Sequence, residues 1–568
     1  MNIKKIIYSL MVLAVLGSCS KIADKLDSNL NNPNTPAPES ASSDLYLNVL
    51  QLGFAGLFDG FSDYGMQVTR QIVMYGPTYG TAYQPQSFDG LWDNAYTTVF
   101  KHANALIPIA NAEKKYVVVG MAKIMKAYTM MTLVDYFGNI PYTDANLGAD
   151  NVNPTVEQGK DVYAKAIALL DEAIADLAKT PGSYPGVFDL FYGATNATGA
   201  KKWVTLAKTL KLRAYVTTRL VDNTVTAKIN ALLTENDLID TQAEDFEFKY
   251  STKQTNPNSR HPRYNGNYSA TGSAGDYIGT YMMWALVYDQ TKGTFSNNPT
   301  SDKSDPRTRY YLYRQRINSS DVNSASSSCS VAPRPAHYTT DMPFCSPIPG
   351  FGGGFWGRDH GDNSGIPPDG PLRTTWGIYP AGGDFDSGQG TSVSLTRGGQ
   401  GAGIQPIWQT AFTQFLKAEA ALMLGTTGSA RTLLESGIRA SFAKVLGFPA
   451  TIAVTPNATY VPSTTRQDNY VAAVLTTYDA ATTNDARLDV IMKEFYLALW
   501  GNGVDAYNNY RRTGKPGNFQ LPIVTAPGAF TSSMYYPSVH VNRNLNGTQK
   551  SGVDVHVFWD NNPAGFNK

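Results

Sequence analysis

Apolar residues recur at helical spacing in several long segments of this chain. The stretch 91–109 places Leu91, Val99 and Leu106 on one face, with polar residues opposite. The stretch 117–137 is apolar on most sides, which predicts a helix that is buried on most of its surface and ends at Gly138. The same reasoning predicts further helices at 156–178, 203–221, 407–424, 430–446 and 485–500.

The pattern changes between residues 250 and 403. This region is rich in Gly, Pro, Ser, Asn and aromatic residues and shows little periodicity. Irregular chain of this length inside a protein is usually functional. We therefore expect one mainly α-helical domain at 41–568, in which a helical scaffold (41–250) and C-terminal helices with a tail (404–568) display a loop-rich insert (251–403) on a surface.

The first residues have the pattern of an export signal. Two lysines precede an apolar stretch at 6–16, which is too short to span a bilayer, and the order Leu-Gly-Ser-Cys then ends at Cys19. This order predicts a lipoprotein signal peptide at 1–18, lipidation of Cys19 and a polar tether at 19–40. The alternative is an ordinary secretory signal. No later run approaches membrane-spanning length, so we expect the mature chain to be held at the membrane by its lipid alone.

Composition limits the partners. Lys and Arg total 47 and Asp and Glu total 46, for a formal net charge of +1, and there is no dense basic run, so we expect no nucleic-acid partner. Charged residues make up only 16%, against a usual ~25%. The 34 tyrosines and 8 tryptophans are consistent with stacking on sugars or peptides, and equally with ordinary packing.

Three cysteines fit an exported lipoprotein. With Cys19 carrying the lipid, Cys329 and Cys345 remain, and an oxidising compartment would let them pair. We predict a disulfide between them, which would stabilise the fold by about 3 kcal/mol in the chain-entropy model.

Several sequence blocks, in order along the chain, resemble those of the SusD/RagB nutrient-binding outer-membrane lipoproteins. The most specific is the Tyr-Arg-Arg-Thr-Gly-Lys-Pro run at 510–516, typical of the SusD-like branch. The other blocks lie at 122–128, 135–142, 162–173, 203–213, 415–420 and 437–441.

The resemblance implies a SusD-like fold of tetratricopeptide-like helix pairs with a loop-rich, ligand-facing region. It also implies a cell-surface lipoprotein of the outer membrane that captures a nutrient, an oligosaccharide or an oligopeptide, for a SusC-type TonB-dependent transporter. Residues 20–24 depart from the pattern of some relatives, because they lack the dense acidic run that those relatives carry after the lipidated cysteine for surface export.

Enzymatic chemistry has little support in the sequence. The six histidines show no zinc-ligand spacing on one helix, and there is no nucleophile elbow or phosphate-binding loop. We expect no enzyme, no metal and no cofactor. A glycan-degrading enzyme remains an alternative, because two converging carboxylates leave no mark in sequence spacing. An adhesion or assembly component is another alternative.

Four charged residues have structural interpretations. We expect Asp135 to be a local hydrogen-bonding residue at its helix end. Arg358 should bind backbone carbonyls or a nearby carboxylate within a structural turn at 357–365. Arg511 and Arg512 should hold neighbouring helices together through planar bidentate hydrogen bonds, rather than contact an anion.

Aromatic residues in irregular segments are the candidates for ligand contact, although each is also compatible with packing. Trp356 is the first candidate, because the glycines at 352–354 and 357 would leave its large ring poorly covered. The candidates form two groups. One precedes the predicted helix at 91–109 and consists of Tyr75, Tyr79 and Tyr83. The other lies in the insert and consists, besides Trp356, of Tyr264, Tyr268, Phe355 and Trp376.

Overall fold

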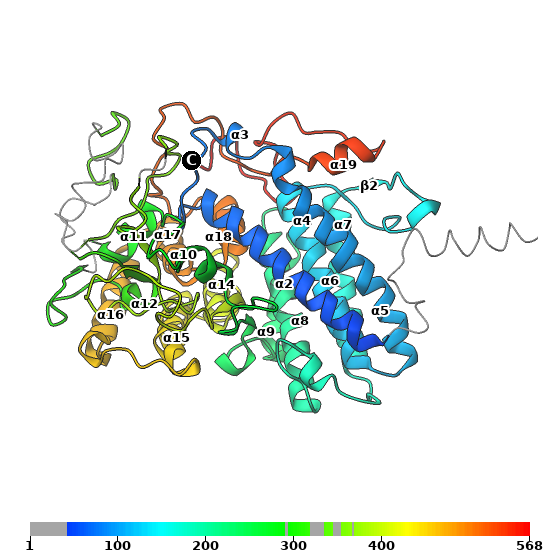
Figure 1. Ribbon diagram of the computed structural model, residues 1–568. Coiled ribbons are helices and arrows are strands. Elements are labelled where there is room, and N and C mark those ends of the chain that lie inside the picture. Colours follow the sequence, from blue (N-terminus) through cyan, green and yellow to red (C-terminus); the bar gives the residue numbers. More distant parts are fainter. Residues whose placement is uncertain (1–41, 290–292, 318–333, 345–353, 366–367) are drawn as a thin grey trace, which may run out of the picture.

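Helices dominate the structure, a computed structural model that describes residues 42–289, 293–317, 334–344, 354–365 and 368–568. Most helices before residue 250 lie on one side of the molecule, and most later helices lie with the irregular chain on the other, but the short helix Ser538–Arg543 lies back beside the N-terminal ones (Figure 1). The N-terminal helices are α2 (Ser43–Val68), α3 (Tyr79–Ala82), α4 (Asp89–Asp93), the π-helix η3 (Asn94–Phe100), α5 (Lys101–Ala112), α6 (Tyr116–Phe137), α7 (Gly159–Leu177), α8 (Ala197–Thr217) and α9 (Val225–Glu235).

The remaining elements divide between the insert and the C-terminal part. The later helices are α10 (Pro262–Asn267), α11 (Thr280–Val287), α12 (Thr308–Tyr311), α14 (Thr410–Leu424), α15 (Ala430–Thr451), α16 (Thr464–Ala480), α17 (Asn484–Ala498), α18 (Gly503–Thr513) and α19 (Ser538–Arg543). Short strands form four antiparallel pairs: β1 (Ile140–Pro141) with β2 (Val156–Glu157), β3 (Phe246–Lys249) with β8 (Ile404–Trp408), β4 (Tyr288–Asp289) with β5 (Gly293–Thr294), and β6 (Leu312–Arg314) with β7 (Thr374–Trp376).

Helices that follow one another in sequence pack on one another. α6 packs on α7 and α7 on α8, and the same relation holds for α14 with α15 and α15 with α16. Each amphipathic helix therefore buries its apolar face against the next one, as in a helical repeat. The expected mainly α-helical fold is confirmed.

The predicted helices exist, with shifted ends. α6 begins one residue before its predicted start and ends at Gly138, whose φ of 82° is readily adopted only by glycine. The stretch 91–109 is not one regular helix, because α4, η3 and α5 follow one another there. The predicted starts at 156 and 407 are wrong, since β2 and β8 occupy those residues.

α2 and α18 cross at a close contact that the helical periodicity did not predict. A Cβ atom at Gly65 would lie 2.1 Å from the Gly503 carbonyl oxygen, and one at Gly503 would lie 2.0 Å from the Ser62 carbonyl oxygen. Only glycine at both positions lets the two backbones approach so closely. The contact places the first described helix directly against a C-terminal one.

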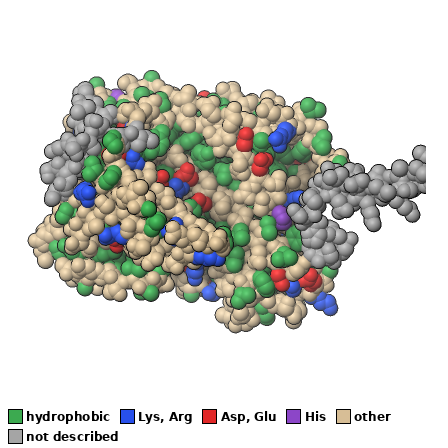
Figure 2. All heavy atoms as spheres, in the orientation of Figure 1, with side chains coloured by type: hydrophobic (Ala, Val, Ile, Leu, Met, Phe, Trp, Pro, Cys, Tyr) green, Lys and Arg blue, Asp and Glu red, His purple; other side chains and the backbone are tan. Residues whose placement is uncertain are grey.

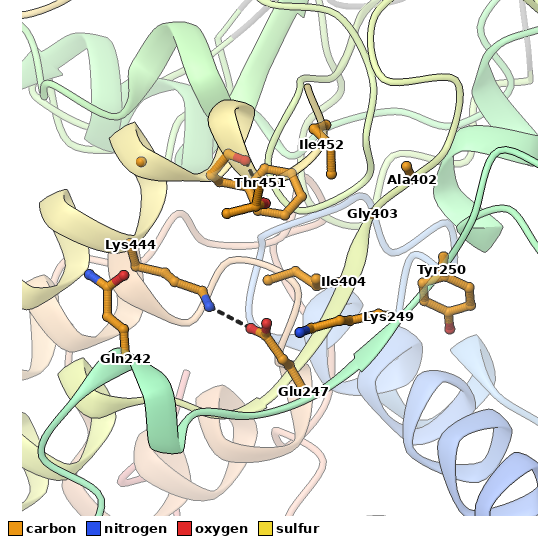
Figure 3. Close-up of a pocket in the computed structure, with 12 residues that line it drawn as sticks. Gln242, Glu247, Lys249, Tyr250, Ala402, Gly403, Ile404, Lys444, Thr451 and Ile452 are labelled. Carbon is orange, nitrogen blue, oxygen red and sulfur yellow. Dashed lines mark hydrogen bonds and ion pairs between the residues drawn. The ribbon is translucent and has the colours of Figure 1, made fainter. Parts of the chain in front are cut away.

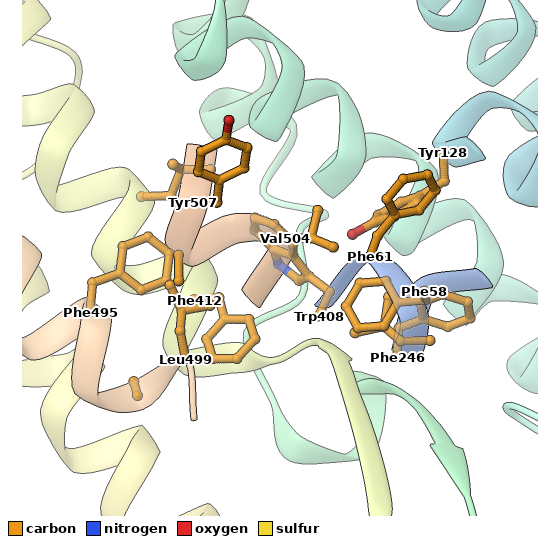
Figure 4. Packing of buried hydrophobic residues seen from close by; sticks show 14 of the residues in the cluster. Phe58, Phe61, Tyr128, Phe246, Trp408, Phe412, Phe495, Leu499, Val504 and Tyr507 are labelled. Carbon is orange, nitrogen blue, oxygen red and sulfur yellow. The ribbon is translucent and has the colours of Figure 1, made fainter. Parts of the chain in front are cut away.

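One continuous hydrophobic core joins the two sides of the molecule. Figure 4 shows side chains of α2, α6, β3, β8, α14, α17 and α18 converging on it. Among the described residues, α6 alone is long and apolar enough to cross a membrane, contrary to the expectation that no such run follows the signal, but 89% of its apolar window is buried inside the protein. α6 is therefore a core helix.

Asp135 is a long-range junction, and the expectation of a local role is wrong. Its carboxylate is fully buried and accepts hydrogen bonds from the Tyr163 hydroxyl (2.5 Å), the Asn508 amide (2.6 Å), the Trp559 indole N–H (2.9 Å) and the Arg213 guanidinium (3.3 Å). These donors come from α7, α18, the C-terminal tail and α8. One carboxylate thus ties together segments from across the chain.

Arg512 connects helices as the sequence predicts. It donates two hydrogen bonds to the buried carboxylate of Glu419 in α14, at 2.8 and 2.6 Å, and Arg219 donates a third at 2.9 Å. Burial alone would raise the Glu419 pKa, but the two guanidinium groups hold that pKa below its usual range. Arg511 instead packs its guanidinium on the Tyr507 ring and donates to the Ser532 carbonyl.

Candidate ligand-binding surface

Tyr75 is an aromatic side chain that the fold leaves exposed. The residue is 38% exposed and lies on the segment that follows α2. There Ile72 forms a β-bridge with Ile278, and the Val73 N–H donates to the Tyr277 carbonyl at 3.2 Å. These backbone contacts bring Tyr75 beside the insert, although about 200 residues separate them in the chain.

Charged and aromatic side chains of the insert hold the Tyr75 ring in place. The Tyr277 ring meets it at 69°, with 6.4 Å between centroids, and the Arg358 guanidinium carbon lies 5.6 Å from its centre. Arg358 is itself fixed by an ion pair with Asp362 (3.0 Å) and a hydrogen bond to the Gly365 carbonyl, as predicted for a structural turn. We call Tyr75, Tyr277 and Arg358 the Tyr75 platform.

The buried carboxylate of Asp369 fixes Tyr277 of the platform and two side chains that pack beside it. Asp369 accepts hydrogen bonds from the Tyr277 hydroxyl (2.6 Å), the Trp356 indole N–H (2.8 Å) and Arg373 Nε (2.8 Å). Burial raises the pKa of Tyr277, and the hydrogen bond to Asp369 raises it further, so its hydroxyl remains a neutral donor. The platform therefore rests on a charge-assisted network that fixes its side chains.

Trp356 belongs to this support, and the expectation that its ring is poorly covered is wrong. Its side chain is 0% exposed and packs with Val73 and Tyr277. The neighbouring glycine explains the difference, because a Cβ at Gly357 would lie 2.3 Å from the Ile278 carbonyl oxygen. The glycine lets the backbone close over the ring instead of leaving it open.

Five other aromatic candidates are also buried in this structure. The Tyr79 hydroxyl accepts a hydrogen bond from Arg70 at 2.7 Å, and the Tyr83 hydroxyl donates to Gln67 at 2.8 Å. Three rings stack face to face with other rings: Tyr264 lies on Tyr268 (4.4 Å, 9°), and Trp376 lies on Trp500 (4.1 Å, 22°). All five, like Trp356, contact the rest of the protein, and their contact with a ligand stays a prediction.

A group of charged side chains adjoins the platform. Arg263 of α10 forms an ion pair with Asp63 of α2 at 2.6 Å and lies 3.9 Å from Asp276. Burial raises the pKa of Asp59, one turn earlier in α2, and Arg263 partly opposes that shift. In Figure 2, acidic and basic side chains gather near the middle of the face, over the C-terminal half of α2. We call Asp59, Asp63, Arg263 and Asp276 the charged border.

The charged border was missed at the sequence level. Its members lie in two distant segments, and only the spacing of Asp59 and Asp63, four residues apart in α2, could have indicated a shared face. α2 itself was not predicted. Burial raises the pKa of Tyr75, and Asp276 adds to that shift, which places border and platform within electrostatic reach of each other.

A hollow of about 340 Å³ lies elsewhere, between β3, β8 and the C-terminal end of α15 (Figure 3). Lys444 forms ion pairs there with Asp245 (3.0 Å) and Glu247 (2.5 Å), and burial raises the pKa of Asp245 to about 6 although Lys444 opposes the shift. These three charges satisfy one another. The hollow therefore offers a ligand its apolar wall, which Ile404, Phe448 and Ile452 provide, and the ammonium of Lys249.

The remaining predicted sites cannot be placed. Cys19, Cys329 and Cys345 lie outside the described residues, so the lipidation and the disulfide stay predictions. Within the described ranges, no group of three or more His, Cys, Asp and Glu side chains is arranged to hold a metal ion.

Solved structures similar to this chain share one fold. A SusD homologue from Bacteroides fragilis is 18% identical, with a TM-score of 0.64 over 92% of this chain and 99% of the other. A SusD/RagB family protein from Bacteroides thetaiotaomicron is 17% identical, with a TM-score of 0.64 over 92% and 100%. A chitin-binding SusD homologue from Flavobacterium johnsoniae is 19% identical, with a TM-score of 0.56 over 90% and 99%.

Two family models match the sequence itself. One, described as starch-binding and associating with the outer membrane, matches residues 58–324. The other, described as SusD and RagB outer-membrane lipoprotein, matches residues 401–554. No curated protein matches the chain. Together the two models match well over half of the chain, and the chain belongs to the SusD/RagB family of outer-membrane nutrient-binding proteins.

Proposed function

We propose that this chain is a cell-surface lipoprotein, anchored by Cys19, that binds an oligosaccharide on the Tyr75 platform without chemically altering it. The exposed Tyr75 ring, held by Tyr277 and Arg358, carries the proposal. The C–H face of a sugar ring can lie on a tyrosine ring, while a few fixed polar groups bind its hydroxyls. The Flavobacterium homologue described as chitin-binding supports a sugar as ligand.

The charged border supports this assignment through its hydrogen-bonding capacity. Asp63 and Asp276 are each partly exposed, with side-chain exposures of 30% and 38%, beside the nearly covered Arg263. Carboxylate oxygens accept and a guanidinium donates, so together they match the hydroxyl and amide groups of a sugar chain. The same paired charges would suit the termini of an oligopeptide, which is the second candidate ligand.

Calorimetry on the soluble form beginning at Ser20 would test the binding proposal, with panels of glycans and peptides. We expect Tyr75→Ala to weaken glycan binding by about tenfold or more, as loss of a stacking aromatic does, and Tyr75→Phe to retain most of it. Phe188 in the 3-10 turn η5 (Gly186–Phe188) is also 38% exposed, so Phe188→Ala is a matched control that should bind normally.

Two results would contradict the binding proposal. Wild-type affinity in Tyr75→Ala would remove the platform from the site, and binding of peptides alone would replace the ligand class. Release of shorter products from a bound glycan would indicate an enzyme instead.

We also propose that a SusC-type TonB-dependent transporter receives the ligand. Membership of an outer-membrane nutrient-binding family supports this partner. The chain, purified from its native membrane in mild detergent, should then carry a large β-barrel protein with it. Its isolation without such a barrel, together with unchanged growth on every nutrient after deletion of the gene, would instead favour an adhesion or assembly role.

A further inference from the structure

One face of α2 changes character along its length. Leu45, Val49 and Leu52 are 62%, 41% and 56% exposed, and their spacing of four and three residues places them on one side of the helix. The same side continues through Asp59 to Asp63 of the charged border. α2 therefore presents an apolar surface at its start and an acidic one near its end. We call Leu45, Val49 and Leu52 the Leu45 stripe.

The surroundings of the stripe favour an apolar contact. Asp44, in the first turn of α2, is paired with Lys115 at 3.2 Å, and Lys115 also pairs with Glu113 at 3.0 Å. Lys115 is therefore shared by two carboxylates, and all three charged groups have a partner within the protein. Tyr46, which is partly buried beside the stripe, packs near His102. Tyrosine is enriched where proteins meet the membrane interface, because its ring is apolar and its hydroxyl is polar.

The chain preceding α2 indicates what covers the stripe. Ser43, the first residue of α2, follows Cys19 by 24 positions. The polar tether predicted from the sequence, at this length, would have a root-mean-square span of about 25–30 Å, so lipid on Cys19 would keep the stripe close to the bilayer. We propose that the Leu45 stripe rests on the lipid surface of the membrane that holds Cys19, as a second contact beside the acyl chains. This inference rests on the proposed lipid anchor.

The contact would set the height of the ligand surface. Eighteen residues of helix separate Leu45 from Asp63, a rise of about 27 Å at 1.5 Å per residue. The border lies on the same side of α2 as the stripe, so the border and the Tyr75 platform stand clear of the bilayer only when α2 is inclined to the membrane, with its first turns on the lipid. A lipid anchor on a flexible tether cannot impose that spacing alone.

Hydroxyl-radical footprinting of the acylated full chain tests the inference. Two states are compared. In the first, the soluble form beginning at Ser20 is free in detergent-free solution, and in the second, the acylated chain is bound to phosphatidylcholine vesicles. We expect oxidation of Leu45, Val49 and Leu52 to fall severalfold on the vesicles. The exposed side chains Val461 (41%) and Leu545 (89%) are internal controls and should react equally in both states.

A serine variant provides the second arm. In Leu45→Ser/Val49→Ser/Leu52→Ser the acyl chains should still carry the protein to the top of a flotation gradient, while the footprint of neighbouring Tyr46 returns to its free value. Losing three exposed apolar contacts should weaken the docking equilibrium by about tenfold or more. Leu545→Ser is the control, and a thermal melt confirms that both variants fold.

The outcomes separate this inference from the proposed function. If the wild-type chain does not float, the lipid anchor is absent and the docking fails with it. If the chain floats but the stripe reacts as in solution, docking alone is overturned. If protection appears only after a β-barrel partner is added, or in concentrated soluble protein, a protein contact covers the stripe and the membrane contact is wrong.

Discussion

The helical scaffold and the loop-rich insert satisfy their buried polar groups in different ways. Helices pair their own backbone groups, so buried arginines in the scaffold, such as Arg512, are free to bind carboxylates of other helices. Where the chain is irregular, arginines bind backbone carbonyls, as Arg511 does where α18 meets the C-terminal tail. In the insert Arg309 donates to the Asp386 and Ser296 carbonyls at 3.1 Å each, and Arg373 donates to the Gly275 carbonyl at 2.6 Å. In the insert, side chains thus satisfy buried backbone carbonyls that helices and strands satisfy elsewhere.

This difference explains how an irregular region can hold a precise surface. The Tyr264 hydroxyl lies within hydrogen-bonding distance of three backbone carbonyls, and the Gln315 amide donates to two. Such contacts fix loops that have no ladder of their own. The insert should therefore depend on individual polar side chains more locally than the scaffold does, and substitutions in the two regions test that contrast.

The largest effect should come from the scaffold junction at Asp135. Asp135→Ala leaves the Arg213 guanidinium without one of its two carboxylates and removes the acceptor of three further donors. We expect the free energy of unfolding to fall by about 3–5 kcal/mol in urea titrations. Asp171→Ala, which breaks an exposed pair with Lys211, is the control and should cost less than about 1 kcal/mol. Equal losses in the two variants would show that the junction is unimportant.

A smaller and local effect is expected at the support of the Tyr75 platform. Asp369→Asn removes the charge that Tyr277, Trp356 and Arg373 share, at a cost of about 1.5–3 kcal/mol. Limited proteolysis should then cut the insert faster, while amide exchange in α6 and α7 stays unchanged. Asp341→Asn, at an exposed position, is the control. Faster exchange throughout the scaffold would contradict the idea that the insert is stabilised locally.

Acid should weaken the insert through His261. Burial lowers the pKa of His261 to about 3, and the charge of Arg263 lowers it further. The neutral ring caps the start of α10, because its Nδ1 accepts a hydrogen bond from the backbone N–H of Arg263 at 3.1 Å. Below pH ~6.5 the unfolded chain binds a proton that the folded chain does not, so stability falls as pH drops, by about 2 kcal/mol at pH 5. His261→Asn keeps a capping acceptor and should flatten this slope. An unchanged slope in urea titrations from pH 7 to pH 5 would contradict the prediction.

The smallest effect should be found at the outer surface of the scaffold. Arg439 pairs with Glu435 (2.9 Å) and Asp468 (2.8 Å), linking α15 to α16, but nearly half of its side chain is exposed. Arg439→Ala should change the free energy of unfolding by no more than about 1 kcal/mol, because water and salt screen such pairs. A loss comparable to that of Asp135→Ala would mean that exposure does not separate the two kinds of ion pair.

The sequence predicted the helices whose buried positions are apolar and periodic. It did not predict the helices whose buried face is polar or interrupted by glycine. α6 was placed within one residue because its apolar positions are unbroken. α18 was not predicted as a helix, since its buried face carries Asn508, Arg511 and Arg512, whose partners lie far away in the chain. Four glycines interrupt the pattern of α2, and one of them, Gly65, serves a helix crossing that only the three-dimensional structure reveals.

The candidate site was likewise predicted in part. Sequence reasoning placed both Tyr75 and Trp356 among the candidates but ranked Trp356 first, because glycines next to a ring predict either an open loop or a close backbone contact. The structure contains the second case at Trp356 and leaves Tyr75 exposed. The charged border depends on α2 facing α10 and has no signature in local sequence.

The pairing of β3 with β8 has a consequence for how this protein could diversify. Lys249 lies opposite Ile404, so the chain leaves the scaffold and returns to it at adjacent positions. A segment whose ends meet can change length at little entropic cost, since doubling a loop adds only about 0.6 kcal/mol. The segment 250–403 can therefore change in length and sequence, so that evolution or a protein engineer alters its part of the recognition surface while the same two strands continue to join its ends to the rest of the protein.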